Sequence, residues 1–511
     1  MLTHIKGAKC IGIEAVEVTV EVDIDNGVGI HLVGMADIAV KESLLRTTTA
    51  LLSSGYRIPG RKIVINLAPA DMKKNGSGYD LPIAVGIIAA SGQAEFPDAG
   101  AYLIMGELGL DGSIRYIPGG LVYAELAARS ALKGLILPAQ SAAEAAEIDG
   151  LKVYGVNRLQ DVVEILGRGK GSEFEIARAR DPGRAARRKA EPDFSEIIGQ
   201  ESAKRGMEIA AAGAHNMIMI GPPGSGKTSL AKALAGILPP MSRAEALVTG
   251  RIYSVAGKHR SGGVLDRSRP FRAPHCSASL AAMTGGGSGS SISPGEVSLA
   301  CNGVLFLDEF GQIPRAVTEA LRGPMEDRKV VISRMRSKVE FPASFMLVAA
   351  SNPCPCGYYG DGDRCRCTPY QRAAYLSRLS GPIMDRIDIQ TYVRPVPSGE
   401  ILRRRPGERS EAIAARVLEA RERQRRRFAD EGIETNAEMS TAQIRRFCQL
   451  DDGSSALLGE IMDKQRLSMR AYFRIIKVAR SIADLAGEDS IRREHLLEAA
   501  SFRLLDKMNI L

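Results

Sequence analysis

A glycine-rich loop that ends in a lysine and a threonine has the clearest chemistry in the sequence. Residues 217–234, MIMIGPPGSGKTSLAKAL, pass from an apolar strand pattern through this loop into a helix pattern. Glycines let backbone N–H groups turn inward around phosphate oxygens, next to the positive end of the following helix. The pattern predicts an ATP site in which Lys227 contacts the β- and γ-phosphates and Thr228 binds Mg²⁺. The predicted nucleotide-binding residues of the loop are Gly221, Pro222, Pro223, Gly224, Ser225, Gly226, Lys227 and Thr228.

Polar side chains follow two further apolar strand patterns. GVLFL, at residues 303–307, ends in Asp308 and Glu309, and SFMLVAAS, at residues 344–351, ends at Asn352. A carboxylate at the carboxyl end of a parallel strand next to the loop can hold the metal, which we assign to Asp308. Glu309 would orient and deprotonate the attacking water. Asn352 would sense the γ-phosphate or position the water, although an Asn at a strand end can also be a turn residue. Together these residues predict an ATP hydrolase.

Four of the eight cysteines lie within fourteen residues, at Cys354, Cys356, Cys365 and Cys367. Four thiolates suit tetrahedral Zn²⁺. The pairs have CxC spacing rather than the usual CxxC, and free thiols are the alternative. Clustered cysteines in a chain without export signals bind metal more often than they form disulfides. We therefore predict a zinc site in an insertion at residues 354–367.

The 511 residues predict three or four domains at about 150 residues each. Residues 1–166 alternate strand and helix patterns and form the first domain. Residues 167–193 are rich in Gly, Arg and Ala and are predicted to be an exposed basic linker, with a nucleic-acid arm as the alternative. Residues 194–394 carry the ATP motifs and form the ATPase domain. Residues 395–511 are almost wholly helical in pattern and form the C-terminal domain.

Composition limits the class of protein. With 45% apolar and 25% charged residues, the chain is neither mostly disordered nor collagen-like. The net charge of +9 is compatible with nucleic acid partners but is also common in proteins without them. No apolar run approaches the roughly 18 residues of a membrane span, and the N-terminus lacks a signal-peptide pattern. We expect a soluble cytoplasmic protein without membrane partners.

The order of these motifs, followed by SGPIMDRIDI and SMRAYFRIIKVARSIADL, resembles the magnesium-chelatase-like AAA+ ATPases. The chain is most similar to the YifB/ComM family of bacterial proteins, over essentially its whole length, in stretches such as GYDLPIAVGIIAASGQ, FRAPHCSAS and NPCPCGYYGD. The resemblance implies an α/β fold with a P-loop AAA+ core and a helical lid. It also implies a hexameric motor that drives branch migration on single-stranded or branched DNA.

The resemblance assigns roles to further residues. Arg386, in MDRID, would be an arginine finger that enters the ATP site of a neighbouring subunit, and Arg470, in SMRAY, would be the sensor arginine of the lid. Two insertions would face the central pore. One is a β-hairpin over RKVVISRMRSKVEF, and the other is the Gly- and Ser-rich segment at residues 275–296. Disordered surface loops are the alternative for both. The hairpin residues predicted to contact DNA are Arg334, Arg336 and Lys338.

The first domain resembles Lon-type peptidase domains, which have the α+β fold called ribosomal S5 domain 2-like. The likeness lies in KKNGSGYDLPIA and GELGLDGSIRYIPGG. Aligned by these glycines, the nucleophilic serine position falls on Gly78 and the partner lysine position on Val122. Ser77 is adjacent, but no lysine stands near the position that would activate it. We expect no proteolysis, and a role in interaction, strand guidance or assembly.

Taken together, the motifs and the family resemblance predict an ATP-hydrolysing ring motor that acts on DNA, a branch-migration helicase that supports recombination or natural transformation. The alternative is a magnesium-chelatase-type motor subunit that remodels a protein partner. A third hypothesis, an ATP-dependent protease or unfoldase, is weakened by the missing Ser–Lys pair.

Overall fold

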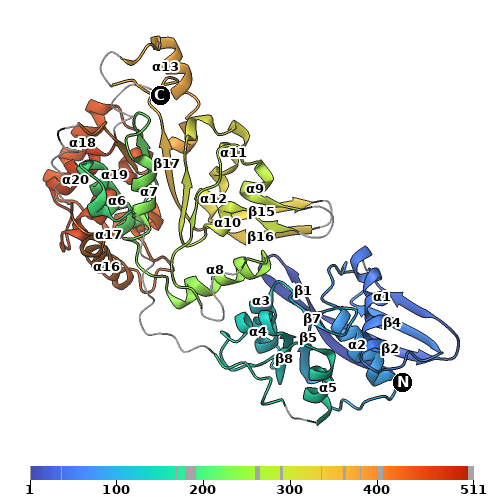
Figure 1. Ribbon diagram of the computed structural model, residues 1–511. Coiled ribbons are helices and arrows are strands. Elements are labelled where there is room, and N and C mark those ends of the chain that lie inside the picture. The colour runs from blue at the N-terminus through green and yellow to red at the C-terminus, as the bar shows by residue number, and fades with distance from the viewer. Residues whose placement is uncertain are drawn as a thin grey trace.

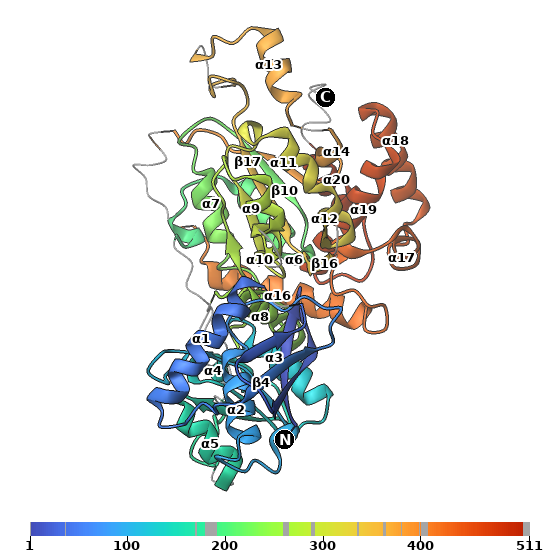
Figure 2. The same cartoon turned by 90° about the vertical axis from the view of Figure 1, so that its right-hand side faces the viewer.

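Two α/β units and a helical C-terminal part make up the computed structural model (Figure 1). The structure describes residues 2–35, 37–168, 171–178, 192–258, 265–287, 292–334, 337–360, 364–379, 381–397, 399 and 407–503. In both views the first domain lies at one end of the molecule, with helix α8 (Arg243–Val255) at its junction with the ATPase domain (Figures 1 and 2).

The first domain is built on a seven-stranded mixed sheet with the order β3-β4-β2-β1-β5-β8-β9. The pairs β1–β2 and β2–β4 are antiparallel, and the others are parallel. Its strands are β1 (Thr3–Ile11), β2 (Glu14–Asp25), β3 (Ile30–Val33), β4 (Lys62–Ala68), β5 (Tyr102–Ile104), β8 (Gly134–Pro138) and β9 (Lys152–Val156), with a small separate pair of β6 (Glu107–Leu108) and β7 (Ile114–Arg115). Its helices are α1 (Ile38–Ser53), α2 (Asp80–Ala90), α3 (Gly120–Arg129), α4 (Ala139–Ala145) and α5 (Leu159–Arg168).

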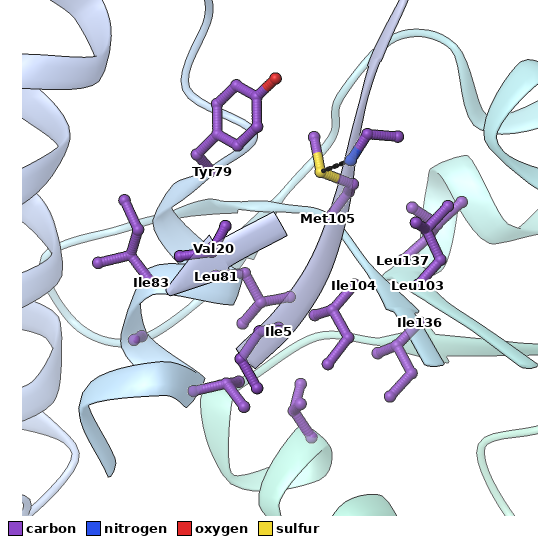
Figure 3. Close-up of a cluster of buried hydrophobic side chains, with 14 of the residues drawn as sticks. Ile5, Val20, Tyr79, Leu81, Ile83, Leu103, Ile104, Met105, Ile136 and Leu137 are labelled. Atoms are coloured by element: carbon purple, nitrogen blue, oxygen red, sulfur yellow. Dashed lines mark hydrogen bonds between the residues drawn. The ribbon is translucent and has the colours of Figure 1, made fainter. Parts of the chain in front are cut away.

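The core of this domain follows the strand pattern of the sequence. Along β2, Val18, Val20 and Val22 are fully buried, while the residues between them are partly exposed, as expected for a strand with one wet face. Helix α2 is buried on all sides and lies against β1 and β2. Figure 3 shows Leu81 of α2 beside Ile5 and Val20, so the apolar helix pattern marks the centre of the domain.

The predicted linker begins with residues that are attached to the first domain. Ile176 N donates to Val153 O over 2.8 Å, and Gly155 N donates to Phe174 O over 2.9 Å, so residues 174–176 run beside β9. Ile176 also packs against the core of the domain. Residues 169–170 and 179–191 of the predicted linker lie outside the described residues.

The ATPase domain contains a five-stranded, wholly parallel sheet with the order β11-β14-β17-β10-β18. All residues of the three central strands are buried, as is typical of parallel sheets covered on both faces. The strands are β10 (Met217–Ile220), β11 (Phe271–Arg272), β14 (Val304–Leu307), β17 (Met346–Ser351) and β18 (Ile389–Tyr392).

Different helices cover the two faces of this sheet. On one face, Met217 and Val304 pack with α6 (Glu201–Gly213), α7 (Lys227–Leu234) and the C-terminal helices. On the other, Ile218 and Leu305 contribute to a second core that includes residues of α9, α10, α11 and α14. The helices around this second core are α9 (Leu280–Thr284), α10 (Glu296–Leu299), α11 (Arg315–Ala320), α12 (Arg322–Asp327), α13 (Pro369–Leu376) and α14 (Gly381–Met384).

The C-terminal domain is helical, as predicted. It consists of α16 (Ser410–Arg427), α17 (Thr441–Phe447), α18 (Asp452–Gln465), α19 (Met469–Leu485) and α20 (Arg493–Ser501). Helices α16 and α19 pack on α6 of the ATPase domain. Across the part of the chain that the structure describes, no helix combines the length and apolarity needed to cross a bilayer.

The first domain contacts the ATPase domain through α3 and α8. Gly119 N donates to Ser254 O over 3.0 Å, and the guanidinium of Arg251 lies 3.0 Å from the Glu125 carboxylate. A second contact involves the turn between β1 and β2, because a Cβ on Gly12 would lie 2.9 Å from Glu340 O. The first domain therefore touches both α8 and the strand that carries Glu340.

Arg46→Ala tests the buried ion pair of the first domain. Asp80 is fully buried and accepts from Arg46 Nε at 2.9 Å and Nη2 at 3.1 Å, and burial raises the pKa of Asp80 although Arg46 opposes this. Removing Arg46 leaves a buried carboxylate without its cation, so we expect a loss of about 3 kcal/mol in the free energy of unfolding. Lys133→Ala, in an exposed pair with Asp98, is the matched control and should cost less than about 1 kcal/mol. Equal losses in urea denaturation would contradict the buried-pair interpretation.

Candidate ATP site and the arginines around it

The glycine-rich loop connects the carboxyl end of β10 to the start of α7, as predicted. Gly224 and Gly226 have φ values of +74° and +90°, which side-chain-bearing residues rarely adopt. A Cβ on Gly221 would lie 2.2 Å from Val393 O, so this glycine is needed for the close approach of the loop to the end of β18. The sequence therefore forces the loop to curl at the first turn of α7.

The donors in the loop fit a phosphate chain. Lys227 Nζ is buried and donates to Gly221 O and Pro222 O, each over 2.8 Å. Burial lowers the pKa of Lys227, and the charges of Asp308 and Glu309 oppose this. Ser225 Oγ is buried, and no protein group among the described residues bonds to it. A cation and a buried hydroxyl around left-handed glycines are the chemistry that binds phosphate oxygens.

The predicted metal ligands lie together. Thr228 Oγ1 donates to Asp308 Oδ2 over 2.8 Å, which brings the first turn of α7 to the end of β14. A hydroxyl and a carboxylate are hard oxygen ligands of the kind that Mg²⁺ prefers, so the pair fits the metal of an ATP site.

Glu309 follows directly and has a φ of +48°, a left-handed conformation at the strand end. Cys276 Sγ lies 3.8 Å from Glu309 Oε2. The sequence analysis missed the place of Cys276 beside Glu309, because the two residues meet only through the fold. The segment FRAPHCSAS at residues 271–279, which contains Cys276, was the available signal.

Asn352 joins the loop from the third strand. Its Oδ1 accepts from Lys227 Nζ at 3.3 Å, and β17 pairs in parallel with both β10 and β14. The structure thus brings together the predicted loop, Asp308, Glu309 and Asn352 at one edge of the sheet. Gln200 was missed by the sequence analysis, and its Nε2 donates to Ser225 O over 3.4 Å.

The four clustered cysteines lie next to this edge. Their Sγ atoms are all within 4.8 Å of one another, with 3.4 Å between Cys354 and Cys356 and 3.8 Å between Cys354 and Cys365. Gly357 lies within this cysteine loop (residues 354–367). A Cβ on it would lie 2.7 Å from Pro223 Cδ, so the cysteine loop is in direct contact with the glycine-rich loop.

The two predicted arginines are held in ion pairs. Arg386 is buried and bonds to Glu326 and to Pro382 O. Arg470 stands on the first turn of α19 with 68% of its side chain exposed, and its Nη1 lies 3.3 Å from Asp385 Oδ2. The structure therefore places Arg470 beside the segment that carries Arg386.

A buried network missed by the sequence analysis fixes that segment. Asp388 accepts from Arg474, from His215 Nδ1 at 3.3 Å and from Asn216 N at 3.2 Å. Burial raises the pKa of Asp388, but Arg474 and His215 outweigh this and hold the pKa well below its usual range. Charged residues so far apart in the chain give no local sequence signal.

The predicted hairpin is present as β15 (Lys329–Arg334) and β16 (Ser337–Pro342), which pair antiparallel. Lys338 is exposed, and its Nζ lies 3.4 Å from Glu340 Oε1. Arg336 and the side chain of Arg334 lie outside the described residues. The second predicted insertion contains α9 and a short pair of β12 (Gly285–Gly286) and β13 (Ser293–Pro294), and its residues 288–291 lie outside the described residues.

In the first domain, buried side chains surround the two positions that match the serine and the lysine of the peptidase dyad. A Cβ on Gly78 would lie 3.0 Å from Met105 Cε, and Val122 is buried. Ser77 Oγ bonds to the carboxylate of Glu107. The sulfur of Met105 also accepts from a backbone N–H of β1, Ala8 N, at 3.2 Å, and Figure 3 draws this contact.

Comparison with known proteins places the chain in a family. The family model described as magnesium chelatase, subunit ChlI, matches residues 193–401. A second family model, described as subunit ChlI of Mg-chelatase, matches residues 20–141. A third, described as magnesium chelatase, subunit ChlI C-terminal, matches residues 407–503. The YifB protein of Escherichia coli K12 is 43% identical over all of this chain and 98% of its own length. The competence protein ComM of Haemophilus influenzae is 41% identical over 98% of this chain and 96% of its own length.

The chain belongs to the YifB/ComM family of magnesium-chelatase-like AAA+ proteins. Membership agrees with the P-loop core and helical C-terminal part, and it supports an ATPase-type protein that uses ATP and Mg²⁺. The loop, acid pair and amide of this YifB/ComM protein occupy the positions that such an activity requires.

Lys227→Ala tests the ATP site of this YifB/ComM protein. Without the ammonium, the phosphate charge loses its nearest cation, so we expect ATP binding to fall by at least about 100-fold in a titration with a fluorescent ATP analogue. Lys232→Ala, on the exposed face of the same helix, is the matched control and should bind as the wild type does. Tight ATP binding by the Lys227→Ala protein would overturn the assignment.

Proposed function

We propose that this protein is an ATP-hydrolysing ring motor that acts on DNA, as a branch-migration helicase in recombination or natural transformation. The observation that carries the proposal is the position of the basic hairpin. It follows the Asp308–Glu309 strand end through α11 and α12 and returns directly into β17, which ends at Asn352. Both ends of the hairpin module are therefore connected to strands that end in the ATP site, and we propose that a change at the nucleotide reaches the hairpin through them.

The chemistry of the site follows from its side chains. Thr228 and Asp308 would hold Mg²⁺, and the ion would neutralise part of the phosphate charge. Lys227 leaves its carbonyl partners for the β- and γ-phosphate oxygens. Glu309 orients a water and accepts its proton, and Asn352 holds the γ-phosphate side of the site. These roles account for ATP hydrolysis without any residue of the first domain.

An arginine finger that enters the ATP site of a neighbouring subunit requires at least two subunits. Arg386 in that role stabilises the charge on the transferring phosphoryl group, which elsewhere contributes roughly 10³–10⁵ in rate. Arg470 closes the lid over the nucleotide of its own subunit. The family resemblance makes a hexameric ring the form in which these two roles are combined.

DNA is the proposed partner because the hairpin is basic and the whole chain carries +9. Arg334, Arg336 and Lys338 would contact the phosphate backbone, which is recognised without reading bases. The relative from Haemophilus influenzae is named a competence protein. That name agrees with a role in the handling of incoming DNA.

For the first domain we propose a Lon-like fold without peptidase activity. The packing around Gly78 and Val122, and the Ser77 bond to Glu107, support the absence of a dyad. Its β1–β2 turn lies against Glu340 of the hairpin. This contact favours a role in which the first domain holds the hairpin in place and guides the DNA strand.

We also propose that the four clustered cysteines bind one Zn²⁺. A tetrahedral site with Zn–S bonds of about 2.3 Å has sulfur–sulfur distances of roughly 3.8 Å. The three Sγ separations among Cys354, Cys356 and Cys365 are 3.4, 3.7 and 3.8 Å, so little movement is needed to accept the ion. Through Gly357 and Pro223 the zinc would also brace the glycine-rich loop.

The alternative function is a magnesium-chelatase-type motor that remodels a protein partner. The descriptions of the three matching family models favour it. The two functions differ in what stimulates hydrolysis, since a DNA motor responds to polynucleotide and a chelatase-type motor to its partner protein.

DNA stimulation and the hairpin are tested together with Lys338→Ala. We expect single-stranded or forked DNA to stimulate ATP hydrolysis by the wild-type protein and the protein to drive branch migration of a synthetic junction.

The Lys338→Ala variant loses one phosphate contact. Its affinity for single-stranded DNA should fall, and the slope of log affinity against log salt concentration should be smaller by about 0.7. Lys464→Ala is the matched control, because this exposed lysine also pairs with a glutamate. If no DNA stimulates hydrolysis while a partner protein does, the chelatase-type alternative holds.

Metal analysis tests the cysteine cluster. We expect near one zinc per chain in the purified protein, and its loss in Cys365→Ser/Cys367→Ser, because two ligands cannot hold a structural zinc. Cys10→Ser in the first domain is the control and should keep the metal. Since Gly357 contacts Pro223, the double variant should also bind ATP more weakly. Absence of zinc from the wild type prepared without chelators would leave the free-thiol alternative.

A further inference from the structure

Arg386 is enclosed within its own chain. Its side chain is 9% exposed, one terminal nitrogen bonds to Glu326 and the other to Pro382 O. Among the described residues none accepts a hydrogen bond from its buried Nε. A guanidinium in this position cannot reach another subunit, so a finger role requires its side chain to leave Glu326.

The backbone around Arg386 does not provide that movement. Asn216 Nδ2 donates to Arg386 O over 3.1 Å, and Arg503 Nη1 donates to Ile387 O over 2.8 Å. Asp388 is anchored in its buried network two residues further on. Because the main chain is held on the carboxyl side, the freedom available to Arg386 is rotation of its side chain.

Glu326 belongs to the module that carries the hairpin. It lies in α12 (Arg322–Asp327), and β15 begins at Lys329, so only two residues separate Glu326 from the first strand of the hairpin. Its side chain is 56% exposed. Water screens the half-exposed carboxylate of this pair, and a phosphate group offers the arginine more negative charge and a pair of oxygens that its two terminal nitrogens can bond.

We propose that Glu326 is the resting partner of Arg386, and that Arg386 exchanges this carboxylate for the phosphate of ATP bound in the neighbouring subunit. The inference rests on the proposed role of Arg386 as a finger supplied to a neighbour. The exchange releases α12 from the Arg386 segment. ATP in one subunit therefore frees the hairpin of the next, which links charge neutralisation to movement. Glu326 is a positioning residue, since it touches neither nucleotide nor DNA.

Glu326→Gln tests the exchange, because it removes the charge and keeps the shape. The freed finger should raise hydrolysis at limiting ATP about two- to fivefold, the range expected for a partly exposed ion pair. Stimulation by DNA should fall by a similar factor, since the hairpin is already released. Glu319→Gln on the adjacent helix α11, where Glu319 pairs with Arg322 at 3.0 Å, is the matched control and should behave as the wild type does. An unchanged rate for Glu326→Gln overturns the proposal.

Mixed rings test whether the effect acts on a neighbour. Subunits with Glu309→Gln keep Arg386 but cannot hydrolyse ATP, and subunits with Arg386→Ala keep an intact site without a finger. Mixing them restores complete interfaces, and adding Glu326→Gln to the Glu309→Gln chain should raise that rescue two- to fivefold. Equal rescue with and without Glu326→Gln overturns the exchange. Absence of rescue from either donor contradicts the finger role itself, so the two failures are distinguishable.

Glu326→Ala is the control for any local effect of the amide that Glu326→Gln introduces. It removes the acceptor entirely and should raise the rescue at least as much as Glu326→Gln does. A midpoint of thermal unfolding equal to that of the wild type shows that the chain is intact. Higher rescue by Glu326→Gln alone, without Glu326→Ala, would assign the effect to the amide and overturn the exchange.

Discussion

Every part of the ATP site depends on the parallel register of β14, β17 and β10. Leu307 stands opposite Ala349, and Ile220 opposite Ser351, so the three strands end at one edge and project Asp308, Asn352 and the glycine-rich loop toward one another. A shift of one residue in a strand reverses the faces of its side chains. The apolar strands are buried on both sides, and this packing holds the proposed metal ligands, the lysine and the amide close together.

The site was predictable where its residues follow a strand directly. The loop after β10, the acids after β14 and Asn352 after β17 each begin at the first residue after the strand, so local pattern and sheet geometry are enough. The hairpin was predictable for the same reason, since its alternation and turn are local. The cysteine cluster was recognisable because its four ligands fall within fourteen residues.

Residues that meet through distant packing were not predictable. Arg421, on the arginine-rich helix α16, is buried and donates to Ala211 O, and burial lowers its pKa to about 9. The helix as a whole carries many arginines, and composition does not distinguish the one that inserts between α16 and α6. The pairing of Arg386 with Glu326 likewise joins residues sixty positions apart. In both cases tertiary contacts decide which of several similar charges becomes buried.

Two arginines one turn apart on α19 illustrate how the fold separates fixed from exchangeable contacts. Arg474 pairs with Asp388, which is only 4% exposed, whereas Arg470 pairs with Asp385, which is 45% exposed. Breaking the first pair leaves a buried carboxylate uncompensated, at a cost of roughly 3–5 kcal/mol. Breaking the second costs less than about 1 kcal/mol, because water screens both partners. Arg470 can therefore exchange its partner at little cost, as its proposed role in the lid requires, while Arg474 keeps the same helix anchored to the segment beside Arg386.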